Sequence, residues 1–182
     1  MISQIKEIYS YREMIWMLVR RDLRGRYKAS FLGFLWTFLN PLLQLAVYTI
    51  VFSVILRSAI EKYYLFLFIA LIPWMFFASS VQGGATCIVA QKDMVTKIHF
   101  PRQVIPIAHV TACFVNMLLC FIVVFLFCGF DVGLDIAVLP YIIPVMLTEY
   151  ILAIGLCFIV SGATVYFRDL EHITGIIVML WQ

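Results

Sequence analysis

The chain has 182 residues, of which 64% are hydrophobic and 13% charged, and its formal net charge is +3. Soluble domains are about 45 to 50% apolar and about 25% charged, so the composition excludes both a water-soluble globular fold and a disordered chain. It predicts an integral membrane protein, and the small net charge does not favour nucleic acid as a partner.

The N-terminal segment, residues 1–30, is too polar to span a membrane but has a helical pattern. Apolar side chains recur at spacings of seven and four, which places them on one face of a helix. They are Ile8, Ile15, Val19, Leu23 and Tyr27. Lys6, Glu13, Arg20 and Arg24 fall on another face.

An amphipathic helix of this kind is expected to lie in the cytoplasmic interface, with its basic side toward anionic headgroups. The alternative is a solvated charge run that only sets the topology. The residues expected at the interface are Trp16, Arg20, Arg21, Arg24, Arg26, Tyr27 and Lys28.

Four long apolar stretches follow. Residues 31–56, 63–91 and 103–130 contain no charged side chain, and residues 137–167 contain only Glu149. About 20 apolar residues cross a hydrocarbon core of about 30 Å, so each stretch is long enough to span it. A fifth run begins near Ile173, but the ten residues to Gln182 rise only about 15 Å as a helix.

The predicted fold is therefore an all-α integral membrane protein. An amphipathic interface helix within residues 1–30 precedes a transmembrane domain, residues 31–182, with four complete membrane helices and the start of a fifth. Pro41, Pro73 and the pair Gly83 and Gly84 lie inside spans and predict kinks.

Basic residues are divided unevenly between the segments that separate the spans. The N-terminal segment has seven Lys or Arg residues, the loop after the second span three and the loop after the fourth span one, whereas the two other loops have two and none. Lys and Arg are enriched on the cytoplasmic side of membrane proteins. We therefore expect a multi-pass protein of the cytoplasmic, or inner, membrane with its N-terminus in the cytoplasm.

Glu149 is the only acidic residue inside an apolar stretch. A carboxylate at the centre of a bilayer costs at least about 2.5 kcal/mol, so such a residue is either functional or shallow. If the fourth span starts near Ala137, Glu149 lies near mid-depth and is a candidate site for a proton or a cation. If Pro140 and Pro144 mark an outer loop, the span begins at Tyr150 and Glu149 is interfacial, which is the interpretation we prefer.

Three motifs carry a resemblance to a known family. They are RRDLRGRYKASFLGFLWTFLNP at residues 20–41, KIHFPRQVIP at residues 97–106 and, more weakly, YFRDL at residues 166–170. In this order and at this spacing they resemble the ABC type-2 permeases that export polysaccharides, namely the O-antigen, teichoic acid and capsule exporters. The resemblance extends over essentially the whole chain.

The resemblance implies six membrane helices, dimerisation around a central channel and a separate ATP-binding cassette ATPase docked on the cytoplasmic loops. Chains of that family are longer, so we expect that this one is truncated at its C-terminus. The loop 92–106 is the best docking candidate by position, as a short coupling helix seated in a groove. The alternative is a connector whose basic residues only follow the topology rule. The expected docking residues are Lys97, Phe100, Pro101, Arg102, Arg168 and Asp169.

The first span has an aromatic stripe. At 100° per residue five aromatic side chains share one face of the helix, and Trp36 points away from that face. The five are Phe31, Phe34, Phe38, Tyr48 and Phe52. Aromatic faces beside hydroxyl and amide groups suit the passage of sugars, and the alternative is a stripe that packs against lipid or helices. The channel-lining candidates are Phe34, Phe38, Gln44, Tyr48, Thr49 and Phe52.

The chain carries no residues for ATP chemistry, because none of its nine Gly residues is followed by Lys as a phosphate-binding loop requires. We expect no enzyme activity, no metal site and no cofactor in this chain, with ATP and Mg²⁺ on the partner. The predicted function is the permease subunit of an ATP-driven exporter of polysaccharide or lipid-linked glycan, acting as a homodimer. The alternatives are a secondary transporter or channel that uses Glu149, an ABC exporter of a drug or a lipid, and a membrane enzyme of glycan synthesis.

Overall fold

The computed structural model describes residues 2–27, 32–55, 63–131 and 139–182. Every regular element in these ranges is helical. The chain forms α1 (Ile2–Ser10), α2 (Arg12–Tyr27), a short 3₁₀ turn η1 (Gly33–Leu35), α3 (Trp36–Thr49), a π-helical segment η2 (Ile50–Ile55), α4 (Tyr63–Ala90), α5 (Lys92–Lys97), α6 (Val104–Asp131), α7 (Leu139–Tyr166) and α8 (Leu170–Trp181). The all-α class is confirmed.

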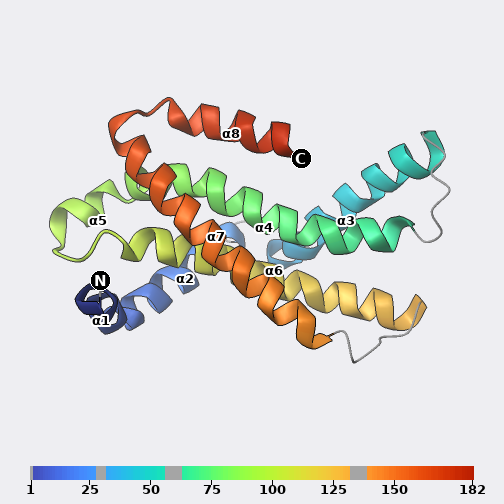
Figure 1. The fold of residues 1–182 in the computed structure, drawn as a ribbon, viewed down its shortest axis with the longest axis horizontal. Coiled ribbons are helices and arrows are strands. Elements are labelled where there is room, and N and C mark those ends of the chain that lie inside the picture. Colours follow the sequence, from blue (N-terminus) through green and yellow to red (C-terminus); the bar gives the residue numbers. More distant parts are fainter. Residues whose placement is uncertain (1, 28–31, 56–62, 132–138) are drawn as a thin grey trace.

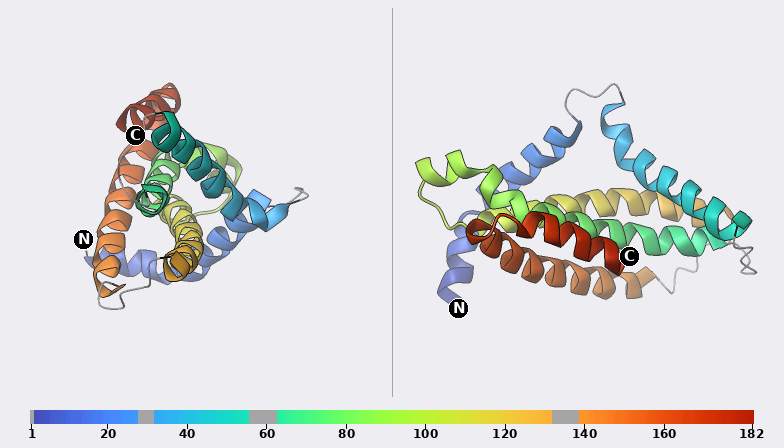
Figure 2. Two further views of the ribbon diagram at one scale, coloured as in Figure 1. Left: turned by 90° about the vertical axis from the view of Figure 1, so that its right-hand side faces the viewer. Right: turned by 90° about the horizontal axis from the view of Figure 1, so that it is seen from above.

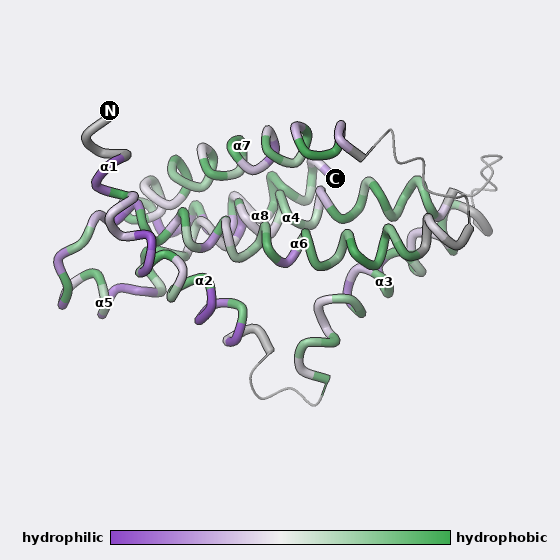
Figure 3. The backbone as a smooth tube through the Cα atoms, turned by 90° about the horizontal axis from the view of Figure 1, so that it is seen from below, coloured by the Kyte–Doolittle hydropathy of each residue, from purple (hydrophilic) through white to green (hydrophobic). Residues whose placement is uncertain are grey.

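Four helical stretches are long and apolar enough to cross a membrane. They are Gly33–Phe52, Tyr64–Ala90, Val104–Leu126 and Pro140–Tyr166. The fifth apolar run forms α8, a helix of 12 residues. Hydrophobic residues cover α4, α6 and α7 along most of their length, whereas hydrophilic and hydrophobic residues alternate along α1, α2 and α5 (Figure 3). The predicted number of spans and their order are therefore confirmed.

Helix α4 is the centre of the bundle. It contacts α3, α6, α7 and α8, and the end-on view shows these helices arranged around it (Figure 2). Its inner face supplies Phe68, Ile72 and Phe76 to a core that also contains Val110 and Met117 of α6. On another side, Phe77 of α4 packs against α8, where its ring centroid lies 5.8 Å from that of Trp181.

The three segments that the charge count assigns to one side of the membrane lie at one end of the bundle. Helices α1 and α5 and the turn between α7 and α8 are together at this end (Figure 1). Helix α2 leaves it and packs against α6. The fold therefore brings the predicted docking loop, the turn with Arg168 and the start of the interface segment close to one another.

Two glycines allow α4 to approach its neighbours closely. A Cβ at Gly83 would lie 2.6 Å from the His109 ring of α6, and a Cβ at Gly84 would lie 2.5 Å from Cys157 Sγ of α7. Helix α4 continues as one helix through Gly83, Gly84 and Pro73. The helix is therefore not broken at the glycine pair, and the pair admits side chains from two different helices. The predicted kink stays a prediction.

The fourth span does not begin at Tyr150. Helix α7 runs from Leu139 to Tyr166, with Pro140 in its first turn and Pro144 inside it, so the prolines do not form an outer loop. Proline is tolerated in a first helical turn because its missing N–H has no intrahelical partner there. The preferred interpretation was wrong on this point, and Glu149 lies inside α7, about 15 Å along the axis from its start.

We predict that Gly84→Ala destabilises the bundle, because the new methyl group would collide with Cys157 Sγ. Overpacking of this kind costs about 1 to 3 kcal/mol. The measurement is the thermal unfolding midpoint of the detergent-solubilised protein. Gly155→Ala is the matched control, because a Cβ at Gly155 of α7 meets nothing within 4 Å. Equal midpoints for the two variants would contradict the packing role, and Cys157→Ala combined with Gly84→Ala should recover part of the loss.

Candidate docking and coupling site

The loop between α4 and α6 contains a short helix that is anchored to the bundle. Helix α5 spans Lys92–Lys97, with Asp93 in its first turn and Lys97 in its last, which matches the helix dipole. Met94 and Phe100 pack against the apolar cluster formed by α2 and α6. Phe100 and Pro101 are therefore half-buried, whereas Lys97 and Arg102 are exposed. Of the predicted docking residues in this loop, the two cations are presented at the surface and Phe100 serves as an anchor.

Two predicted docking residues that are distant in sequence line one hollow. Arg102 precedes α6 and Arg168 follows α7, and together with Lys92 of α5 they border a space of about 500 Å³ between α4, α5, α6 and α7. Phe158 and Val165 supply part of its apolar wall. Among the described residues that line it none is acidic, so the hollow suits an acidic or anionic partner. We call this space, which Lys92, Arg102 and Arg168 border, the cationic hollow.

The remaining docking candidates lie beside the cationic hollow without lining it. Asp169 is exposed and precedes α8, where its carbonyl oxygen accepts hydrogen bonds from the N–H groups of His172 and Ile173 at 3.1 Å each. Lys97 is at the far end of α5. No group of three or more His, Cys, Asp or Glu side chains in the described ranges has the arrangement of a metal site.

The interface segment packs through its apolar face as the spacing predicts. Val19 is fully buried, and Leu18 is buried beside it, against Val104, Ala108 and Ala112 of α6. Ile15 and Leu23 are partly buried on the same face. The apolar face therefore contacts the protein rather than lipid alone.

The basic side of the segment faces outward. Trp16, Arg20, Arg21 and Arg24 are exposed, and the Arg20 guanidinium lies 5.9 Å from the centroid of the Trp16 ring, a cation–π contact. The side chains of Arg26 and Tyr27 and the whole of Lys28 lie outside the described residues.

A polar junction connects the interface segment to two membrane helices. Asp22 Oδ2 of α2 lies 3.9 Å from His109 Nδ1 of α6, and His109 Nε2 lies 3.3 Å from the carbonyl oxygen of Ser79 in α4. The His109 ring occupies the space that Gly83 leaves open. One imidazole therefore holds α2, α4 and α6 together, and both of its nitrogens face oxygen acceptors.

The aromatic stripe of the first span has two halves. Phe34 and Phe38 form an edge-to-face pair with centroids 5.3 Å apart, and Tyr48 and Phe52 form a tilted pair at 6.5 Å. The backbone is 3₁₀ at Phe34 and π-helical at Phe52, so 100° per residue does not hold over the whole stripe. Phe31 lies outside the described residues.

The polar residues beside the stripe are half-buried. These are Gln44 and Thr49. The Thr49 hydroxyl is buried without a hydrogen-bond partner, and the Tyr48 hydroxyl accepts a hydrogen bond from the side-chain amide of Gln182, at the end of α8. The role of the stripe as a channel lining stays a prediction.

Comparison with known proteins identifies the family. Residues 13–182 match the ABC-2 type transporter family. The chain belongs to this family. The match covers α2 from its second residue and every span, and it confirms the resemblance that the three motifs carry.

Three relatives of this ABC-2 transporter chain are named O-antigen export system permease protein RfbA. One, from Myxococcus xanthus, is 38% identical over 185 residues, which cover 100% of this chain and 70% of the relative. Two from Klebsiella pneumoniae are 33% and 32% identical, and each alignment covers 92% of this chain and 65% of the relative. The chain thus spans about two thirds of the length of these relatives.

The polar junction of this ABC-2 transporter chain had no predicted role. Asp22 belongs to the first motif, and His109 lies inside the apolar run of residues 103–130. A signal was present, because Asp22 follows the buried Val19 by three residues and so lies beside the apolar face of α2. Nothing in the sequence alone indicated which span this face would meet.

We predict an energetic coupling between Asp22 and His109. Their side chains are 25% and 13% exposed, so the pair is screened less than a surface pair. A double-mutant cycle with Asp22→Asn and His109→Gln, measured by unfolding of the solubilised protein, should give about 1 kcal/mol.

The control is the pair of Arg21 and Asp22, 3.7 Å apart, in which the Arg21 side chain is 52% exposed. Its cycle, with Arg21→Gln, should give no more than about 0.5 kcal/mol. A coupling between Asp22 and His109 that does not exceed the control value would show that the junction does not hold α2 in place.

Proposed function

We propose that this chain is the membrane-spanning permease part of an ATP-driven exporter of polysaccharide, with a lipid-linked glycan of the O-antigen kind as its substrate. The observation that carries the proposal is the similarity to O-antigen export permeases over 92 to 100% of this chain. The four spans and α2 agree with it, because they belong to the matched region, residues 13–182.

The energy for export comes from a separate ATPase in this proposal. The chain has no phosphate-binding loop of its own. The ATPase would dock at the end of the bundle where α5 and the turn between α7 and α8 lie, with Arg102 and Arg168 of the cationic hollow toward acidic side chains of the partner. Charged groups at a rim of this kind set the specificity and rate of association.

The docking end lies in the cytoplasm in this proposal. Eleven of the thirteen Lys and Arg residues belong to the N-terminal segment and to the two loops at this end, which supports a cytoplasmic N-terminus and insertion in the inner membrane. A second copy of the permease would complete the passage for the glycan.

Deletion of the gene in the host should abolish the glycan at the cell surface and leave lipid-linked glycan inside the cell. Immunoblots of surface glycan and chromatography of the lipid-linked pool measure the two effects. Expression of the host's own gene from a plasmid should restore the surface glycan. Normal surface glycan in the deletion strain would refute the assignment of substrate.

We predict that Arg102→Glu and Arg168→Glu each weaken retention of the ATPase by about tenfold, because a reversed charge replaces attraction by repulsion at the docking surface. The measurement is co-purification of the ATPase with the tagged permease, followed by surface glycan. Both residues are exposed, so the bundle should stay intact.

The control is Lys62→Glu, the same change of charge in a loop expected on the opposite side of the membrane. It should leave co-purification unchanged. Full retention of the ATPase by both arginine variants would place docking elsewhere. Phe100→Asp is a less specific test, because Phe100 also packs against α2 and α6.

A further inference from the structure

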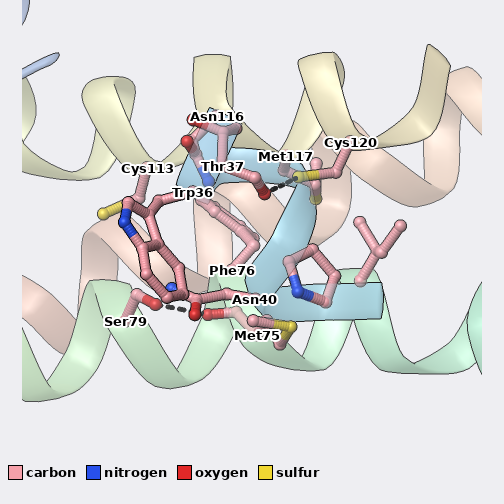
Figure 4. A pocket seen from close by; sticks show the side chains of 12 residues that line it. Trp36, Thr37, Asn40, Met75, Phe76, Ser79, Cys113, Asn116, Met117 and Cys120 are labelled. Carbon is pink, nitrogen blue, oxygen red and sulfur yellow. Dashed lines mark hydrogen bonds between the residues drawn. The ribbon is translucent and has the colours of Figure 1, made fainter. Parts of the chain in front are cut away.

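A polar cavity lies between α3, α4 and α6 (Figure 4). Its volume is about 290 Å³. Hydrogen-bonding side chains from all three helices border it, and the remaining wall is apolar and includes Phe76 and Met117. The hydrogen-bonding residues are Trp36, Thr37, Asn40, Ser79 and Asn116.

The cavity lies partway along the bundle and is open at its side, where Asn40 and Ser79 are exposed. Ser79 is eleven residues from the end of α4 at Ala90, and Asn116 is twelve residues from the start of α6 at Val104. At 1.5 Å per residue, these positions are about 16 Å and about 18 Å from the docking end of their helices. On α4 and α6 this is near the middle of a hydrocarbon core of about 30 Å. Trp36, Thr37 and Asn40 lie at the start of α3.

One hydroxyl group in the wall has no partner. Thr37 is 5% exposed and its Oγ1 makes no hydrogen bond. The carbonyl oxygen of the same residue accepts a hydrogen bond from Cys120 Sγ at 3.4 Å. This bond connects the α3 backbone to α6, but it does not satisfy the Thr37 hydroxyl. A buried hydroxyl without a partner costs free energy, which a bound molecule with hydroxyl groups would remove.

The other polar groups can also serve a ligand. The Ser79 hydroxyl donates to the Met75 carbonyl at 2.6 Å and keeps its capacity to accept. Side-chain amides such as those of Asn40 and Asn116 both donate and accept, and an indole ring offers a flat apolar face with one N–H donor. Trp36 and Asn40 are four residues apart, so they share one face of α3.

The charge of the wall selects the class of ligand. None of the described residues that line the cavity is charged, in contrast to the cationic hollow. A neutral molecule rich in hydroxyl groups therefore fits, and an anion or cation does not. The volume equals roughly ten water molecules at about 30 Å³ each, which is enough for one monosaccharide unit.

We propose that this cavity binds a single monosaccharide unit of the exported glycan. The indole face of Trp36 would cover the C–H face of the sugar ring, and Thr37, Asn40, Ser79 and Asn116 would meet its hydroxyl groups. The site rests on the proposed function for the identity of its natural ligand, but its chemistry is carried by the cavity itself.

The experiment uses the permease as the host's own gene encodes it. The protein is purified in a zwitterionic detergent that contains no sugar. The probe is a methyl glycoside of mannose, galactose or glucose that carries a diazirine group, and mass spectrometry locates the adducts after illumination. Adducts are expected on the peptides of α3, α4 and α6 that line the cavity. An excess of the same methyl glycoside without the diazirine should suppress them.

Thr37→Val and Asn40→Leu should each lower the competed labelling by about fivefold, the loss of one hydrogen bond. Thr37→Ser keeps the hydroxyl and should keep the labelling, which separates binding from folding. Ser80→Ala is the matched control, because the Ser80 hydroxyl is also buried and unpartnered but Ser80 does not line the cavity. It should label like the unchanged protein.

Labelling that free glycoside does not suppress, or equal labelling of Thr37→Val, Asn40→Leu and Ser80→Ala, would overturn the proposal and leave a cavity that holds water only. The assay needs neither the ATPase nor export. Absence of competed labelling therefore refutes the site even where the deletion strain has lost its surface glycan, and the two proposals fail independently.

Discussion

The arrangement of the bundle depends on the absence of two side chains in the middle helix. Helices in a membrane are not driven together by water, so close packing and polar contacts decide which faces meet. At Gly83 and Gly84 helix α4 has no Cβ, and two neighbours fill the space, His109 from α6 and Cys157 from α7. Because these contacts are on different sides of α4, the glycine pair determines how both long helices lie against it.

The contact at Gly83 also connects the interface segment with the interior. Asp22 of α2 meets one nitrogen of His109, and the other nitrogen meets the Ser79 carbonyl oxygen. Ser79 and Cys113 line the polar cavity, and Cys113 Sγ lies 3.8 Å from His109 Nε2. A displacement of α2 would therefore reach the cavity wall through one imidazole ring. In a transporter whose ATPase acts from the docking end, this is a short physical route from docking to the depth of the membrane.

Most of the fold could be predicted, because each span is a charge-free run and the bilayer tolerates few alternatives. The buried face of α2 could be predicted too, since Val19 and its neighbours follow the helical period. The predictions for the first span were less accurate. Its backbone is 3₁₀ at one end and π-helical at the other, so a constant rotation per residue does not hold over its whole length. Of the two starts considered for α7 the preferred one was wrong, because proline is favoured in a first helical turn and Pro140 alone does not indicate a loop.

The sites were harder to predict, because each is formed by residues from several helices. Arg102 and Arg168 were identified one by one, but only the fold shows that they line the same hollow with Lys92. Trp36 was predicted to point away from the aromatic stripe. In the structure Trp36 lines the cavity together with Thr37 and Asn40. Pairing between helices determines such sites, and a single sequence does not contain it.

The separation of charged and neutral sites follows from the cost of charge in a bilayer. A Lys, Arg or Asp at the centre of a membrane helix costs about 2.5 to 3.5 kcal/mol, and that cost falls toward the ends. The three cations of the hollow are at the end of the bundle, where a charged partner can reach them without dehydrating deeply. The cavity instead offers amides, hydroxyls and an indole, which would meet a sugar without any charge. This division fits the two proposals, with ionic contacts at the docking end for the ATPase and neutral hydrogen bonds in the cavity for the glycan.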